Sequence, residues 1–100
     1  MATYAISFNL EYDDKYIDRY NSLMKVIRSF PTVWEETTSF ALIESTRSLE
    51  EVERSLFLSD FSPSKDKMLV INVSHDACIG RGKIKYPATL RKLMPAIEIK

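Results

Sequence analysis

Cysteine, glycine and proline are scarce in this chain of 100 residues, which holds one cysteine, two glycines and four prolines. A single cysteine, Cys78, rules out an intramolecular disulfide, so the fold does not depend on an oxidising compartment. The low glycine and proline content argues against a disordered or fibrous chain. The N-terminus has neither a basic start nor a long apolar run, so it does not resemble a signal peptide. A cytoplasmic location is therefore expected.

Long apolar runs are also missing, and none approaches the roughly 20 residues that a membrane-spanning helix needs. We therefore expect no membrane partner. Apolar residues make up 45% of the chain and charged residues 28%, which is ordinary for a globular protein. The length suits a single domain over residues 1–100, with a core at about 3–80 and a basic C-terminal extension at about 81–100.

Charge is balanced overall but unevenly distributed. Residues 1–60 hold 11 acidic and 6 basic side chains, whereas residues 81–100 hold six basic side chains and one acid, Glu98. The asymmetry indicates either a polyanion-binding end or a segment that docks on an acidic partner or on the acidic half of the chain itself. The candidate nucleic-acid-binding residues are Arg81, Lys83, Lys85, Arg91 and Lys92.

The first half of the chain reads as strand, helix, strand, strand. Residues 3–10 alternate with period two, placing apolar side chains on one face of a strand. A helix is predicted from about Asp14 to Ser29, with Pro31 just beyond it, and two short strands are predicted at 32–38 and 39–44. The helix has a buried stripe at helical spacing, made of Ile17, Tyr20, Leu23, Met24, Ile27 and Phe30.

The second half adds a helix and a strand. Ser48 and Glu51 form a capping box before a helix whose apolar stripe is Leu49, Val52 and Leu56, with Phe57 beside it. A loop at 61–67 precedes a strand at 68–75. A short helix is expected at 88–94 and a short strand at 96–100.

This order predicts an α+β, ferredoxin-like domain: strand, helix, strand, strand, helix, strand, with an antiparallel sheet and a short C-terminal extension. Both helices should cover one sheet face and leave the second face uncovered in a monomer. On that face the first strand carries the small side chains Ala5, Ser7 and Asn9. Because small residues allow another chain to approach closely, a homodimer through this face is expected.

The end of the first strand is the most interesting candidate site, since function often lies in loops after strands. Asp13 and Asp14, with Glu11, could hold a divalent cation through oxygen ligands. The alternative is that Asp13 or Asp14 caps the following helix, and this interpretation is favoured because acids are common at helix starts.

Other motifs are weaker. His75, Asp76 and Cys78 lie too close in sequence for typical triad geometry, and a zinc site would need more ligands. The run from Gly80 to Lys83 lacks the spacing of a phosphate-binding loop, although its cations can meet phosphates. Aromatic side chains that could stack on bases are Tyr12, Tyr16, Tyr20, Trp34 and Tyr86, although Tyr20 fits the core stripe and packing is the commoner role of a Trp on a sheet.

The first strand, residues 4–10, resembles the start of the small CRISPR-associated protein that scaffolds spacer integration, and of its SinR-like and, more distantly, VapD-type ribonuclease relatives. Trp34, the strand at 39–43, the helix start at 48–52 and the strand at 69–73 follow the same order. The outline is closest to the SinR-like group. The resemblance covers about residues 3–80 and implies a ferredoxin-like homodimer.

In nuclease members of that superfamily, an Asp that ends the first strand is thought to hold a metal at the dimer interface. The matching residue here is Asn9, whose neutral amide lacks the charge that attracts Mg²⁺ and cannot act as a base. No catalytic residue is therefore assigned; the candidate position is Asn9, with Glu11 and Asp13. No cofactor is required, and Mg²⁺ or Mn²⁺ is expected only if the chain is a nuclease.

Three hypotheses stay open at this point. The first is a non-catalytic or weakly catalytic homodimer that binds nucleic acid or a nucleic-acid-processing partner. The second is a metal-dependent endonuclease acting on RNA or DNA. The third is a protein-interaction module that makes no contact with nucleic acid.

Overall fold

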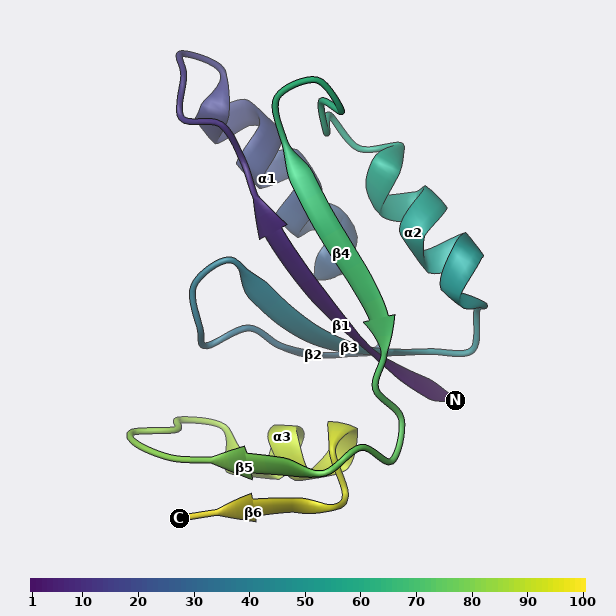
Figure 1. Ribbon diagram of the computed structural model, residues 1–100, viewed down its shortest axis with the longest axis vertical. Helices are drawn as coiled ribbons and strands as arrows, with labels where there is room; N and C mark the ends of the chain where they lie inside the picture. Colours follow the sequence, from purple (N-terminus) through teal and green to yellow (C-terminus); the bar gives the residue numbers. More distant parts are fainter.

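The computed structural model describes residues 1–100 and has the predicted ferredoxin-like order in its first 72 residues. The strands form one antiparallel sheet in the order β2-β3-β1-β4. In Figure 1, α1 lies behind β1 and β4 and α2 lies beside β4, and both helices pack on the same face of the sheet. The elements are β1 (Ala2–Asn9), α1 (Tyr16–Ile27), β2 (Thr32–Trp34), β3 (Phe40–Ser45), α2 (Leu49–Phe57) and β4 (Lys67–Asn72).

The main core lies between the helices and the face of the sheet that they cover. The period-two pattern of β1 places Tyr4, Ile6 and Phe8 on this face, where all three are buried. They meet buried side chains of both helices, and burying each such side chain contributes roughly 1.5–3 kcal/mol. The helix residues in this core are Leu23, Met24, Ile27, Val52 and Leu56.

The predicted stripe of α1 is correct except at its first residue. Ile17 is 60% exposed, whereas Tyr16 packs against the core. Because α1 begins only at Tyr16, the direction of the stripe is set by the later residues Leu23 and Ile27. At 3.6 residues per turn, that direction passes closer to Tyr16 than to Ile17.

The capping box of α2 is present in full. Ser48 Oγ accepts from the Glu51 amide, and the Glu51 carboxylate accepts from the Ser48 amide. The ends of the predicted stripe are less buried than its middle, since Leu49 and Phe57 are more than 40% exposed.

A C-terminal unit, residues 78–100, follows the sheet. It consists of β5 (Cys78–Gly80), α3 (Pro87–Leu93) and β6 (Ile97–Ile99), with β5 and β6 paired in parallel. The sequence indicated the helix and the last strand but not β5. This unit lies below the sheet in Figure 1.

The C-terminal unit covers part of the second sheet face, so the expectation that this face is bare in a monomer is wrong. A second core forms there, and the Thr3 hydroxyl donates a 2.8 Å hydrogen bond to the Leu93 carbonyl. Ala5, which was expected to meet a second chain, is buried by this unit. The buried residues of the second core are Ala5, Trp34, Leu42, Leu90, Leu93 and Met94.

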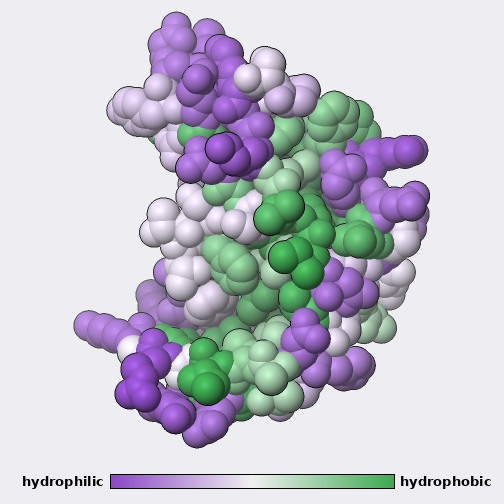
Figure 2. Space-filling model, in the orientation of Figure 1, coloured by the Kyte–Doolittle hydropathy of each residue, from purple (hydrophilic) through white to green (hydrophobic).

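The half of the second face nearest β4 stays open. Leu69 is 65% exposed and Ile71 is 48% exposed, opposite Ser7 and Ala5 on β1. Figure 2 shows hydrophobic residues gathered on this side of the molecule over β4. β4 is also an edge strand, because β1 is its only partner. No helix has both the length and the apolar character needed to cross a membrane.

Candidate functional site

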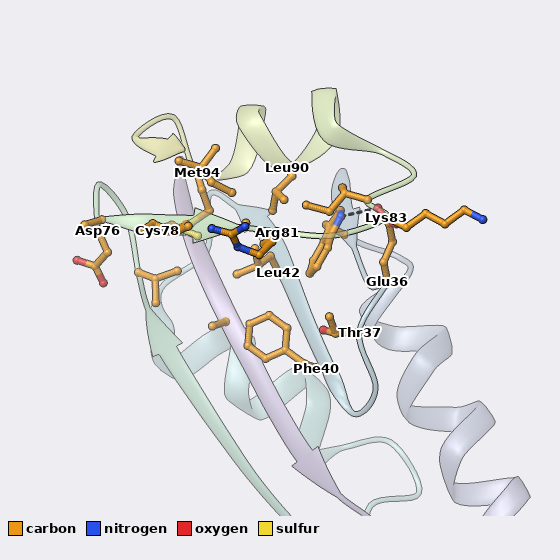
Figure 3. A pocket seen from close by; sticks show the side chains of 18 residues that line it. Glu36, Thr37, Phe40, Leu42, Asp76, Cys78, Arg81, Lys83, Leu90 and Met94 are labelled. Carbon is orange, nitrogen blue, oxygen red and sulfur yellow. Dashed lines mark hydrogen bonds between the residues drawn. The ribbon is translucent and has the colours of Figure 1, made fainter. Parts of the chain in front are cut away.

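A groove of about 580 Å³ lies between the second sheet face and the C-terminal unit. Twelve of its 18 lining residues are hydrophobic. Figure 3 shows Phe40 and Leu42 of β3 on the sheet side, and Leu90 and Met94 on the opposite side. The volume falls within the usual range of small-molecule sites, and the apolar lining with a few polar groups is typical of them.

Glu36 joins the sheet to the loop at 81–86. Its carboxylate accepts hydrogen bonds from the Trp34 indole (2.7 Å) and from the amides of Lys85 (2.6 Å) and Tyr86 (2.9 Å). Burial pushes the pKa of Glu36 upward, but these three donors outweigh it and hold the pKa below its usual value. The carboxylate thereby fixes one end of the groove in its charged form.

Two of the candidate nucleic-acid-binding residues, Arg81 and Lys83, line the groove. Arg81 and Lys83 are exposed and take part in no ion pair or side-chain hydrogen bond. In Figure 3 the guanidinium of Arg81 extends over the middle of the groove, whereas Lys83 points away from it. The third cation of this loop, Lys85, places its ammonium 5.3 Å from the ring centre of Tyr86.

The two cations of α3 differ in their contacts. Arg91 is exposed and unpaired. The Lys92 ammonium lies 3.8 Å from the Glu44 carboxylate and donates a 3.2 Å hydrogen bond to the Thr32 hydroxyl. Lys92 therefore helps to hold α3 on the sheet.

Asn9 shares no hollow with the acids that the sequence grouped with it. It is exposed at the end of β1 and lines a second hollow of about 590 Å³, together with Ser7, Phe40 and Lys67. Phe40 borders both this hollow and the groove. Glu11 and Asp14 are exposed and line neither hollow.

The carboxylate of Asp13 is held by two cations. Lys65 Nζ lies 3.1 Å from Asp13 Oδ2, and a guanidinium nitrogen of Arg19 lies 3.0 Å from Asp13 Oδ1. The Lys65 contact, with help from Arg19, lowers the pKa of Asp13 to about 2. No group of three or more His, Cys, Asp or Glu side chains gathers in a metal-binding arrangement.

The prediction that Asp13 or Asp14 caps α1 is wrong in its detail. The residue before the helix is Lys15, and no side chain caps it. Asp13 instead accepts the Lys15 amide on its carboxylate and the Tyr16 amide on its carbonyl. It therefore shapes the turn that leads into the helix.

Sequence reasoning missed the ion pair between Arg19 and Asp66. The Asp66 side chain is fully buried, and it accepts from Arg19 Nε at 3.0 Å and from the amides of Glu11 and Ser62. Burial pushes the pKa of Asp66 upward, but these donors hold it below its usual value. A clue in the sequence was that Arg19 lies at the rim of the α1 stripe.

The cluster at His75 does not form a catalytic arrangement. His75 is exposed and has a positive φ of 66°. Cys78 is half-buried and lines the groove, and Asp76 lines the end opposite Glu36 (Figure 3). Trp34 is buried against the C-terminal unit, which confirms its packing role.

Comparisons of this chain with protein-family models, with curated proteins and with solved structures found no match.

Proposed function

We propose that this chain is a nucleic-acid-binding protein that acts as a homodimer and contacts phosphates through its C-terminal unit. The observation that carries the proposal is that Arg81 and Lys83 stand at the rim of a groove with no acidic partner. Basic side chains clustered on one face, free to meet an anion, are the electrostatic footprint of a polyanion site.

The separation of charge supports this proposal. The C-terminal unit holds six basic residues and one acid, whereas most acids lie in the helices and loops of residues 11–60. Because the sheet separates the helices from the C-terminal unit, a polyanion meets favourable charge on one side and repulsion on the other. Such a field orients a nucleic acid toward the groove.

Binding without efficient cleavage fits the first-strand site better than nuclease activity does. Asn9 offers a neutral amide, and the Asp13 carboxylate is already held by Arg19 and Lys65. Recruiting Asp13 to a metal would leave the buried Arg19 without one of its two acidic partners.

The test is a binding titration with single- and double-stranded RNA and DNA over a range of salt concentrations. We expect measurable binding at moderate salt, with an affinity that falls as salt rises. The double charge-reversal variant Arg81→Glu with Lys83→Glu should bind every sequence more weakly than the wild type does. It should also flatten the slope of log affinity against log salt by about 1.4 for a single strand, because two phosphate contacts are lost.

The matched control is the double charge reversal Lys25→Glu with Arg54→Glu. It changes the net charge by the same amount as the first variant, but on α1 and α2. This control should bind nearly as the wild type does. Absence of wild-type binding at moderate salt would refute the proposal and favour the protein-interaction hypothesis. Cleavage that a chelator abolishes, and that Asn9→Asp increases, would instead favour the endonuclease hypothesis.

A further inference from the structure

The groove beside Arg81 has a lining that phosphate contacts alone do not explain. We infer that it accepts an unstacked base of a single-stranded nucleic acid while Arg81 contacts the adjoining phosphate. This inference rests on the proposed function and narrows it, because it names single strands as the substrate class and the groove as the site where the base is held.

Shape and lining favour a flat apolar group. The groove of about 580 Å³ is mostly hydrophobic, and its sheet side offers the aromatic ring of Phe40. Aromatic side chains stack on bases of any sequence. A paired base has its faces covered by its neighbours in the duplex, so only an unstacked base can enter.

Charge places the anion near the centre of the groove. Arg81 extends over the middle, while the two acids lie at opposite ends (Figure 3). One of them, Glu36, already accepts three hydrogen bonds, which spread its charge and reduce its repulsion of a phosphate. A base in the groove therefore brings its backbone phosphate closest to Arg81.

The wall formed by β5 and the loop after it is built before any ligand arrives. A Cβ on Gly80 would lie 3.0 Å from Ile84 Cδ1 and 3.3 Å from Ile97 Cδ1, so glycine lets the strand approach these side chains closely. Gly82 has a φ of +104°, which allows the loop to turn back toward Glu36. A preformed groove loses little entropy when a base enters it.

The experiment compares an intact single strand with an abasic strand of the same length, which carries the same phosphates. We expect the intact strand to bind about tenfold more tightly, in line with the usual contribution of stacking by one base. Only the intact strand should change the fluorescence of Trp34, which is the single tryptophan and lines the groove. A duplex of the same sequence should leave the fluorescence of Trp34 unchanged, because its bases stay paired and stacked.

The variant Phe40→Leu removes the ring but keeps an apolar side chain. It should remove most of the tenfold preference in affinity for the intact strand over the abasic strand. The slope of log affinity against log salt should stay unchanged. The matched control is Phe57→Leu, which removes an exposed ring on α2. This control should keep the full advantage of the intact strand.

A second readout works on the wild-type protein and does not depend on how a variant folds. Cys78 is the only cysteine, is half-buried and lines the groove. Its alkylation should slow when the intact strand is bound and should be faster with the abasic strand at equal saturation.

The outcomes separate the two proposals. Equal affinity for intact and abasic strands, or equal alkylation of Cys78, would overturn the base site while leaving phosphate binding in place. Binding of the duplex alone would likewise overturn the base site, whereas absence of binding by single strands and duplex alike would refute the proposed function itself.

Discussion

At the scale of single residues, Arg19 and Asp66 form an enclosed ion pair, with side-chain exposures of 7% and 0%. The pair connects α1 to the loop before β4, and Asp66 also accepts the amides of Glu11 and Ser62. Every buried polar atom of this network has a hydrogen-bond partner. Because a buried charge without its partner is strongly destabilising, both ends must be retained together.

Asp66→Asn keeps the shape of the side chain and removes its charge, so it should lower the free energy of unfolding at neutral pH by about 3 kcal/mol. Denaturant titration measures this change. Asp60→Asn is the control, since Asp60 is exposed and its carboxylate makes no hydrogen bond or ion pair. A loss below that of the control would contradict the structural role of the pair.

The same network contributes to the response of stability to acid. The pKa values of Asp13 and Asp66 are lower in the folded chain than in the unfolded one, so unfolding takes up protons in acid. Their stabilisation is full above about pH 4 and is lost as the pH falls toward about 2, the pKa of Asp13. Asp66→Asn should show a weaker dependence on pH across this window.

At the scale of elements, α3 fixes the C-terminal unit to the sheet. Leu90 and Leu93 are almost fully buried on the second face, and Lys92 reaches Glu44 of β3. The Thr3 hydroxyl adds a hydrogen bond to the carbonyl of Leu93, near the end of the helix. The groove exists only because α3 holds this position, since Leu90 and Met94 form one of its walls.

Leu93→Ala should therefore lower the free energy of unfolding by about 2–5 kcal/mol, the usual cost of a cavity at a buried leucine. It should also expose Cys78 to faster alkylation, because the C-terminal unit loosens. Thr89→Ala, a truncation on the same helix at a half-buried position outside the groove lining, should change both quantities little. Unchanged stability in Leu93→Ala would show that α3 does not anchor the unit.

The elements also show how far sequence reasoning reaches. The period-two pattern of β1 and the capping box at Ser48 depend on neighbouring residues alone, and both were predicted correctly. β5 has only three residues and includes Gly80, so it has no detectable periodicity. The pair of Arg19 and Asp66 spans 47 residues, and charged residues are ordinarily assigned to the surface.

At the scale of the whole molecule, the fold was predicted, but the site between the sheet and the C-terminal unit was not. The cations were identified from composition, whereas the groove they border depends on α3 docking over Ala5 and Leu42. The charge asymmetry left open that this segment docks on the acidic half of the chain, and Lys92 does meet Glu44, but no local pattern in residues 78–100 indicates that α3 packs on this sheet face. The family resemblance stays a prediction.

The open edge of β4 is the place where we expect a second copy. Two β4 strands can pair antiparallel about a twofold axis, which satisfies their free backbone groups and places Leu69 and Ile71 beside apolar side chains of the partner strand. Sedimentation velocity should show a wild-type dimer and a monomeric Leu69→Lys variant. Leu58→Lys, an equally drastic change at a 74% exposed position just after α2, should stay dimeric. A monomeric wild type at all concentrations would contradict the dimer.

The docking of α3 on the second face also has a consequence for synthesis in the cell. The partners that Ala5, Trp34 and Leu42 require, in residues 87–94, are translated after all four strands of the sheet. A nascent sheet can thus complete its helix-covered side while its other apolar side still faces water, a state that invites aggregation. Rapid translation of the last quarter of the chain would raise the yield of native protein. A chaperone that covers the sheet until residues 87–94 have been made would have the same effect.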